Sequence, residues 1–129
     1  MAVGVSSTLA NRWLDYSRGA GAPTSITGAF VQLHTANPGT AGTTSVSSVT
    51  TRPSITFGAS ASGVITQNNT PSWATWAGTN GEVVTHISLW DAAGAGNFLF
   101  SIALSASKTV NTGDTLNLTT SSVTITTAS

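Results

Sequence analysis

Histidine, serine and aspartate lie close together at the end of one apolar stretch, and this combination could support nucleophilic catalysis. His86, Ser88 and Asp91 would be the base, the nucleophile and the orienting acid, which a serine hydrolase holds within hydrogen-bond distance of one another. Side-chain types alternate from Val83 to Trp90, so His86 and Ser88 point to the same side of a β-strand but are held well apart. The chain also has no GxSxG turn that would expose a nucleophile. The sequence therefore predicts no catalytic residue and no enzyme.

Metal and phosphate sites are not indicated either. His34 and His86 are the only histidines, acidic residues number four, and there are no cysteines. A metal would need further ligands, so we expect each histidine to bond a backbone or hydroxyl partner at a strand edge. Gly94 and Gly96 precede a strand rather than a helix, so no helix N-terminus is present to bind phosphate. The sequence predicts no metal and no cofactor.

Three tryptophans could stack on sugar rings, because an aromatic face suits the apolar face of a sugar. Trp90 alternates within a strand and is expected in the core. Trp73 and Trp76 flank a turn, and three roles remain open for them: core packing, contact with a carbohydrate, or contact with another subunit.

Arg52 stands beside Pro53 in a β context, far from other charged residues in the sequence. A guanidinium group binds carboxylates in a two-pronged geometry. We expect Arg52 either to bind Asp91 or Asp114, or to cap carbonyl groups of a neighbouring molecule.

The chain carries very little charge for a protein of 129 residues. Charged residues make up 6% and the formal net charge is zero, while Ser and Thr supply roughly a third of the residues. Four scattered basic residues cannot form the patch that nucleic acid requires, so no nucleic-acid partner is predicted. Few lysines are available to block edge pairing of strands, which favours edges covered by neighbouring subunits. The alternative is a small monomer that is soluble through its hydroxyl groups.

A short helix is predicted at the N-terminus. It would begin with an N-cap in residues 6–8 and end at Arg18-Gly19, a basic last turn followed by a C-cap glycine. Its apolar stripe, spaced for one helix face, consists of Leu9, Trp13 and Tyr16. The stripe must dock either on the chain's own sheet or on a partner, because so short a helix is not stable alone. Neither a secretory signal nor a membrane span is expected.

In the rest of the chain, apolar and polar side chains alternate as they do in β-strands. Turns rich in Gly, Pro, Asn and Asp separate these segments. Seven to eight short strands predict an all-β fold, an antiparallel β-sandwich or jelly roll with a short N-terminal helix. We divide the chain into residues 1–28, a helical arm and linker, and residues 29–129, the sandwich domain. The expected strands lie at 29–35, 55–57, 64–67, 72–76, 83–90, 98–104, 115–118 and 123–126.

Three segments taken in order resemble a group of small virion proteins of tailed bacteriophages. They are LHTANPGTAGT (33–43), TRPSITF (51–57) and VTHISLWDAAGAGNFLFSIALSASKTVNTGDTL (84–116). Members of that group are described as tail-fibre, minor tail or decoration-like proteins. The resemblance covers residues 29–118, and the N-terminal helix also fits it.

The resemblance implies a non-enzymatic structural protein located in the virion. We expect a capsid decoration (cement) protein that contacts the major capsid protein, as a homo-oligomer such as the trimers found in these families. The alternative is a tail-fibre or minor tail protein, with a carbohydrate-binding surface at Trp73 and Trp76. No membrane partner is expected. The candidate interface residues are Leu9, Trp13, Tyr16, Arg52, Trp73 and Trp76.

Overall fold

A computed structural model of the chain describes residues 3–125. It contains one helix and eight strands within that range. In chain order they are α1 (Ser7–Ser17), β1 (Ala29–His34), β2 (Ser54–Ile55), β3 (Val64–Thr66), β4 (Ser72–Trp73), β5 (Glu82–Trp90), β6 (Phe98–Val110), β7 (Leu116–Asn117) and β8 (Ser122–Thr124).

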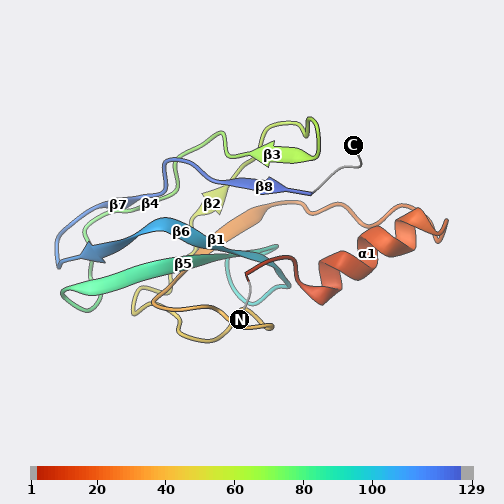
Figure 1. The fold of residues 1–129 in the computed structure, drawn as a ribbon. Coiled ribbons are helices and arrows are strands. Elements are labelled where there is room, and N and C mark those ends of the chain that lie inside the picture. The colour runs from red at the N-terminus through yellow and green to blue at the C-terminus, as the bar shows by residue number, and fades with distance from the viewer. Residues whose placement is uncertain (1–2, 126–129) are drawn as a thin grey trace.

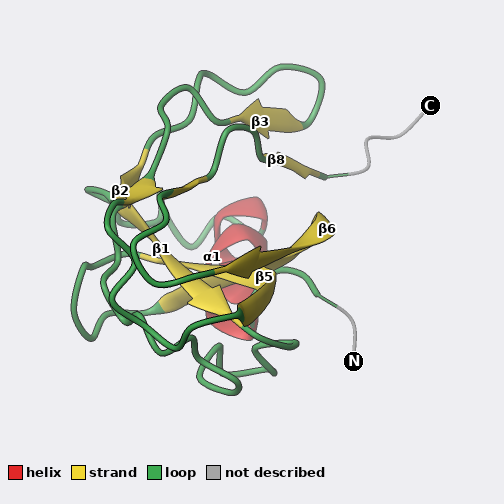
Figure 2. Ribbon diagram, turned by 90° about the vertical axis from the view of Figure 1, so that its left-hand side faces the viewer, coloured by secondary structure: helices red, strands yellow, loops and turns green. Residues whose placement is uncertain are grey.

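The strands form two layers with the core between them. The larger layer is a four-stranded antiparallel sheet in the order β2-β1-β5-β6, and the other consists of two small sheets, β3-β8 and β4-β7 (Figures 1 and 2). The core between the layers is apolar, and it includes Trp73 and Trp76, which are 4% and 1% exposed. The fold is therefore an all-β sandwich with one short helix, which confirms the predicted class.

Helix α1 begins and ends where the sequence indicates. The Ser6 side chain accepts a hydrogen bond from the amide of Leu9 (3.2 Å), which satisfies one of the free N–H groups of the first turn. At the other end the amide of Gly19 donates to Tyr16 O (3.1 Å) and that of Ala20 to Asp15 O (3.0 Å). These two bonds form a Schellman cap, which requires the left-handed φ of +82° found at Gly19.

Strands β5 and β6 form the largest hairpin, and both lie where the sequence predicts strands. Asp91 closes its turn, since its carboxylate accepts from the amide (2.6 Å) and the side-chain Nδ2 (2.7 Å) of Asn97. These bonds hold the pKa of Asp91 below its usual value. Strand β6 is longer than predicted. It contains a large bulge, in which the four residues 104–107 lie opposite Thr85 alone.

The edges of the four-stranded sheet are partly blocked by the chain itself. The N-terminal segment pairs with the outer edge of β6, where Ser6 N donates to Leu99 O (2.7 Å) and Ser101 N to Gly4 O (2.9 Å). Beyond this pairing, the bulge at 104–107 interrupts the edge, and β2 at the opposite edge is only two residues long. The chain itself therefore protects part of these edges, and cover by neighbouring subunits stays a prediction.

The predicted strands at 55–57 and 64–67 are only partly paired with each other. Two backbone hydrogen bonds join them, from Gly58 N to Thr66 O (2.9 Å) and from Asn68 N to Thr56 O (3.0 Å). The main partner of β3 is instead β8, from the far end of the chain. The domain boundary between residues 28 and 29 remains a prediction. The outer ends of the two predicted domains, residues 1 and 129, and the predicted strand end at Thr126 lie outside the described residues.

Candidate functional site

The side of the four-stranded sheet that faces away from the apolar core is polar and buried. Registry places Gln32 opposite Ser88 and Phe30 opposite Trp90 on neighbouring strands β1 and β5. His34 follows on the same face, and its side chain is fully buried together with that of Ser88. The long loop of residues 35–53 covers this face and supplies many of its hydrogen-bond partners.

His34 and Ser88 form the centre of this network. Nδ1 of His34 lies 2.8 Å from the carbonyl oxygen of Thr44, and Nε2 lies 2.7 Å from Ser88 Oγ. A carbonyl can only accept, so we assign the ring proton to Nδ1, and Ser88 then donates to Nε2. Ser88 Oγ accepts in turn from Nε1 of Trp90 (2.8 Å). Burial lowers the pKa of His34, which keeps the ring neutral and suits this arrangement.

A serine bonded to a histidine is the start of a catalytic constellation, but this pair lacks the remaining parts. Both side chains have 0% of their surface exposed, so a substrate cannot reach Ser88 Oγ. The backbone carbonyl of Thr44 lies where a hydrolase has a carboxylate. The indole N–H of Trp90 donates a hydrogen bond to the serine oxygen. The arrangement satisfies buried polar groups and fixes the loop to the sheet.

The histidine beside Ser88 in the sequence has a different partner. Nδ1 of His86 lies 2.7 Å from Oγ1 of Thr85, consistent with the expectation that each histidine meets a hydroxyl or backbone group. The contact between Ser88 and His34 was missed, because it depends on the registry of two strands. The cross-strand alternation of polar residues at Gln32, His34, His86 and Ser88 was the signal that could have revealed it.

Within the chain, Arg52 binds neither Asp91 nor Asp114. Its Nε donates to Oε1 of Gln32 (3.0 Å), its Nη1 donates to the carbonyl of Ala95 (2.8 Å), and Cζ lies 4.0 Å from the ring centroid of Trp90. The expectation of a carboxylate at Asp91 or Asp114 is therefore wrong. Arg52 caps a carbonyl of its own chain, so it joins the covering loop to the β5-β6 turn and stacks on Trp90.

Trp73 and Trp76 belong to the core. They are 4% and 1% exposed, and their Nε1 atoms donate to the carbonyls of Thr51 (2.9 Å) and Thr79 (3.2 Å). Rings buried to this extent do not form an exposed platform for a sugar. Of the three roles left open by the sequence, the structure supports core packing, and contact with another subunit stays a prediction. Trp90 is also buried, as predicted, but on the polar face.

Glu82 provides another anchor for the covering loop. Its carboxylate accepts from the hydroxyl of Ser47 and from the amide of Ser48 (3.1 Å). Partial burial opposes ionisation of Glu82, but these hydrogen bonds outweigh it and lower the pKa of the carboxyl group. Within the described range, no group of three potential metal ligands is present. No helix in residues 3–125 has the length and hydropathy needed to cross a bilayer.

The exposed apolar side chains gather around α1. On the helix, Leu9 is buried against β6, whereas Trp13 is 37% and Tyr16 62% exposed, because α1 extends beyond the end of the sheets (Figure 1). We call the exposed large apolar residues at this end the apolar end. They are Val3, Val5, Trp13, Leu14, Tyr16, Ile26 and Ile125, and they are most of the exposed large apolar residues described.

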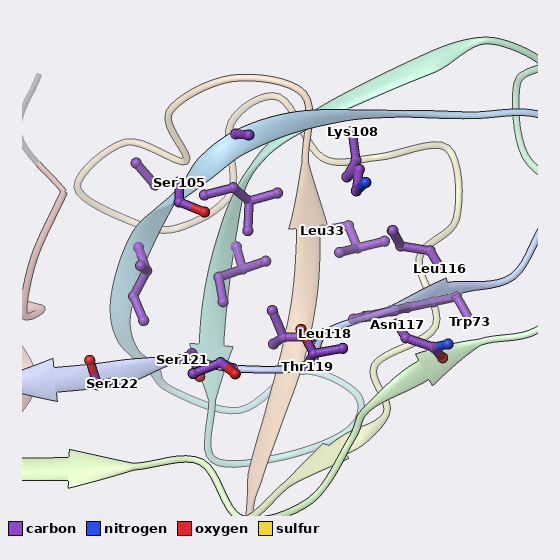
Figure 3. Close-up of a pocket in the computed structure, with 16 residues that line it drawn as sticks. Leu33, Trp73, Ser105, Lys108, Leu116, Asn117, Leu118, Thr119, Ser121 and Ser122 are labelled. Carbon is purple, nitrogen blue, oxygen red and sulfur yellow. The ribbon is translucent and has the colours of Figure 1, made fainter.

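A groove opens between the two layers on another part of the surface. One wall is the bulged part of β6, with Ser105 and Lys108, and the other is the segment of residues 116–122 (Figure 3). Leu33 and Trp73 lie at its floor, and its volume is about 350 Å³. Its walls carry half-buried apolar side chains, namely Ile102, Leu104, Leu116 and Leu118.

Comparison with known proteins places the chain in a family. It matches the model of the Gp80 family, described as podophage GP4 fiber I protein gp80, over residues 4–126. No curated protein matches the chain. The family match confirms the resemblance to virion proteins of tailed phages. Because the match covers nearly the whole chain, this protein belongs to the Gp80 family and is a bacteriophage structural protein.

Proposed function

We propose that the protein is a non-enzymatic subunit of a phage fibre, which acts by binding copies of itself and neighbouring virion proteins. The family description supports a fibre rather than the predicted capsid decoration role. The buried, hydrogen-bonded pair of His34 and Ser88 offers no exposed nucleophile and therefore gives no support to a catalytic role.

The observation that carries this proposal is the apolar end. On α1, Tyr16 of the apolar stripe is 62% exposed, Leu14 outside the stripe is 66% exposed, and only Leu9 is buried. Exposed large apolar side chains concentrated at one end of a small domain favour an interaction site there. Leu9 attaches α1 to its own sheet, Trp13 is only 37% exposed, and Tyr16 and Leu14 are available to a partner.

The low charge of the chain supports assembly as well. With a net charge of zero, the chain also lacks the repulsion that keeps monomers apart.

Labelling of intact particles tests the proposed location. Gold-labelled antibodies against the protein should mark fibres or the tail in electron micrographs of purified virions. Labelling spread over the capsid surface would reject the fibre role and support a capsid decoration protein, which remains the second prediction from the sequence.

A phage with an altered helix tests the apolar end itself. Replacing both Leu14 and Tyr16 by Ser should leave folding intact, because both are exposed, but should remove the protein from purified particles. The matched control is Val83→Ser, which changes a 42% exposed apolar residue outside the apolar end and should leave incorporation normal. Equal incorporation of both variants would contradict the proposed role of the helix.

A further inference from the structure

We propose that Asn80 is a site of spontaneous deamidation, and that the isoaspartate formed there releases the covering loop of residues 35–53 from the turn that holds it. Asn80 and Gly81 form the sole Asn-Gly pair of the chain, and both are exposed in the turn between β4 and β5. This turn lies at the end of the sandwich opposite α1 (Figure 1). The chemistry is independent of the proposed fibre function.

The reaction joins neighbouring atoms of the chain and needs only water as a co-reactant. The backbone nitrogen of Gly81 loses its proton and attacks Cγ of Asn80, so that a new bond forms between them. The bond from Cγ to Nδ2 breaks and ammonia leaves, which gives a cyclic succinimide. Water then opens the ring at either of its two carbonyl carbons. The product is aspartate when the original backbone bond is kept, and isoaspartate when the main chain continues through the side-chain carbon.

The nucleophile, the electrophile and the leaving group are all accessible in this turn. Gly81 has no side chain to shield its nitrogen, and its amide donates no hydrogen bond within residues 3–125. Oδ1 of Asn80 accepts a hydrogen bond from the amide of Thr112 (3.0 Å), which polarises the carbonyl under attack and stabilises the negative charge that develops on this oxygen. The leaving atom, Nδ2, has no hydrogen-bond partner in the part of the chain that the structure describes.

The backbone of the turn is also weakly closed. The hydrogen bond from Glu82 N to Thr79 O that spans it is 3.3 Å long, at the weak end of the range for such bonds. Small movements of the exposed turn can therefore bring the Gly81 nitrogen to Cγ of Asn80 without disturbing the core.

The other asparagines of the chain are poorer sites. Each of them precedes either a residue whose side chain hinders the attack, or, at Asn37, a proline that has no N–H. Asn97 is also held in place, because its Nδ2 donates to the carboxylate of Asp91 (2.7 Å). We expect Asn80 to react several-fold faster than any other asparagine.

The turn around Asn80 attaches the covering loop to the sandwich. The amide of Thr79 donates to Ser48 Oγ (2.8 Å), and the carboxylate of Glu82 accepts from the hydroxyl of Ser47 and the amide of Ser48. Isoaspartate inserts a methylene group into the main chain between Thr79 and Glu82. The turn then no longer holds these two residues at the spacing that the loop requires.

Aspartate, the other product, should leave the loop in place. It keeps the length of the main chain, and its carboxylate still accepts the hydrogen bond from the amide of Thr112. The two products therefore differ in their effect although both carry the same added charge.

Ageing of the purified full chain tests the reaction. The protein is incubated at mildly alkaline pH, where more of the attacking nitrogen is deprotonated, and is then digested and analysed by mass spectrometry. The peptide with residue 80 should exchange its amide for a carboxyl group several-fold faster than the peptide with the exposed Asn11, and isoaspartyl methyltransferase should label it. Asn80→Gln is the matched control and should stay unlabelled there, because its longer side chain forms a cyclic imide far more slowly. Reaction at Asn80 no faster than at Asn11 would overturn the proposal.

Hydrogen exchange on the same samples tests the release of the loop. The amides of residues 47–49 donate hydrogen bonds in this structure, so they should exchange several-fold faster after ageing, while the amides of β1 and β5 stay protected. Aged Asn80→Gln and fresh Asn80→Asp should both keep slow exchange in the loop, which separates isoaspartate from other effects of ageing and from added charge. Isoaspartate at residue 80 with unchanged exchange at 47–49 would refute the role of the turn in holding the loop.

Discussion

Ser88 Oγ lies 2.7 Å from Nε2 of His34, although 54 residues separate the two in the chain. The registry of β1 and β5 brings them together, and Trp90 completes the chain of hydrogen bonds from the same strand. Both side chains are fully buried, so the hydrogen bonds between them and their neighbours replace those that the polar atoms make with water in the unfolded chain. The pair thereby attaches the covering loop, through Thr44, to the centre of the sheet.

Acid should destabilise the protein through His34. Burial lowers the pKa of His34 in the folded state, so below pH 6.5 the unfolded chain binds more protons than the folded one. The free energy of unfolding should therefore be constant above about pH 7.5. It should fall by up to about 1.4 kcal/mol per pH unit as the pH drops below 6.5, until the folded-state pKa is reached. Denaturant titrations at pH 7.5, 6.0 and 5.0 measure this dependence.

Two variants separate His34 from other acid-sensitive groups. His34→Gln should unfold more easily at pH 7.5 but lose the slope between pH 6.5 and 5, whereas His86→Gln should retain it. Glu82 and Asp91 have lowered pKa values as well, but their contribution is present above the unfolded pKa values of 4.5 and 3.8 and is lost only at lower pH. A slope that persists in His34→Gln would contradict the assignment.

Removal of the Ser88 hydroxyl should be costly. Ser88→Ala leaves Nε1 of Trp90 without an acceptor and Nε2 of His34 without a donor, both in a buried site. We expect a loss of about 2–4 kcal/mol in the free energy of unfolding, since each buried unsatisfied group costs about 1–3 kcal/mol. Ser105→Ala, at an exposed position, should change it by less than about 0.5 kcal/mol. Equal effects of the two substitutions would show that the network does not stabilise the fold.

Local signals in the sequence predicted most of the elements. The N-cap at Ser6, the cap at Gly19 and the β5-β6 hairpin depend on residues close together in the chain, so spacing alone reveals them. The pairing of β3 with β8 joins residues about 60 positions apart. Short alternating segments do not specify which distant strand they meet, because any similar segment satisfies the same pattern.

The site residues were harder to predict for the same reason. Arg52 binds Gln32 and the carbonyl of Ala95 because the covering loop folds over the sheet, and no spacing rule describes that path. Trp73 and Trp76 flank turns in the sequence, which suggested exposure, but the second layer of the sandwich closes over them. The helix itself lies where it was predicted, whereas the burial of Leu9 and the exposure of Tyr16 depend on where the sheet ends.

The geometry of Arg52 predicts that lysine cannot replace it. Arg52→Lys keeps the charge but loses the planar group that stacks on Trp90 and donates from both Nε and Nη1. We expect a loss of about 1–2 kcal/mol in the free energy of unfolding, close to that of Arg52→Ala. Arg18→Lys, on the exposed surface of α1, should be neutral. A neutral Arg52→Lys would mean that charge alone matters at this position.

Gly42 should tolerate no side chain. Its φ of +71° favours glycine, and an added Cβ would lie 2.5 Å from the ring of Phe98. Gly81 has a similar φ of +74° but open space around it, so Gly42→Ala and Gly81→Ala share the conformational cost and differ in the clash. We expect about 1–2 kcal/mol for Gly81→Ala and a further 1–3 kcal/mol, approximately, for Gly42→Ala, measured by denaturant unfolding. Phe98→Leu should relieve part of the extra cost in the Gly42→Ala background, because a smaller side chain leaves room for the methyl group, and an unchanged cost would place the strain in the backbone alone.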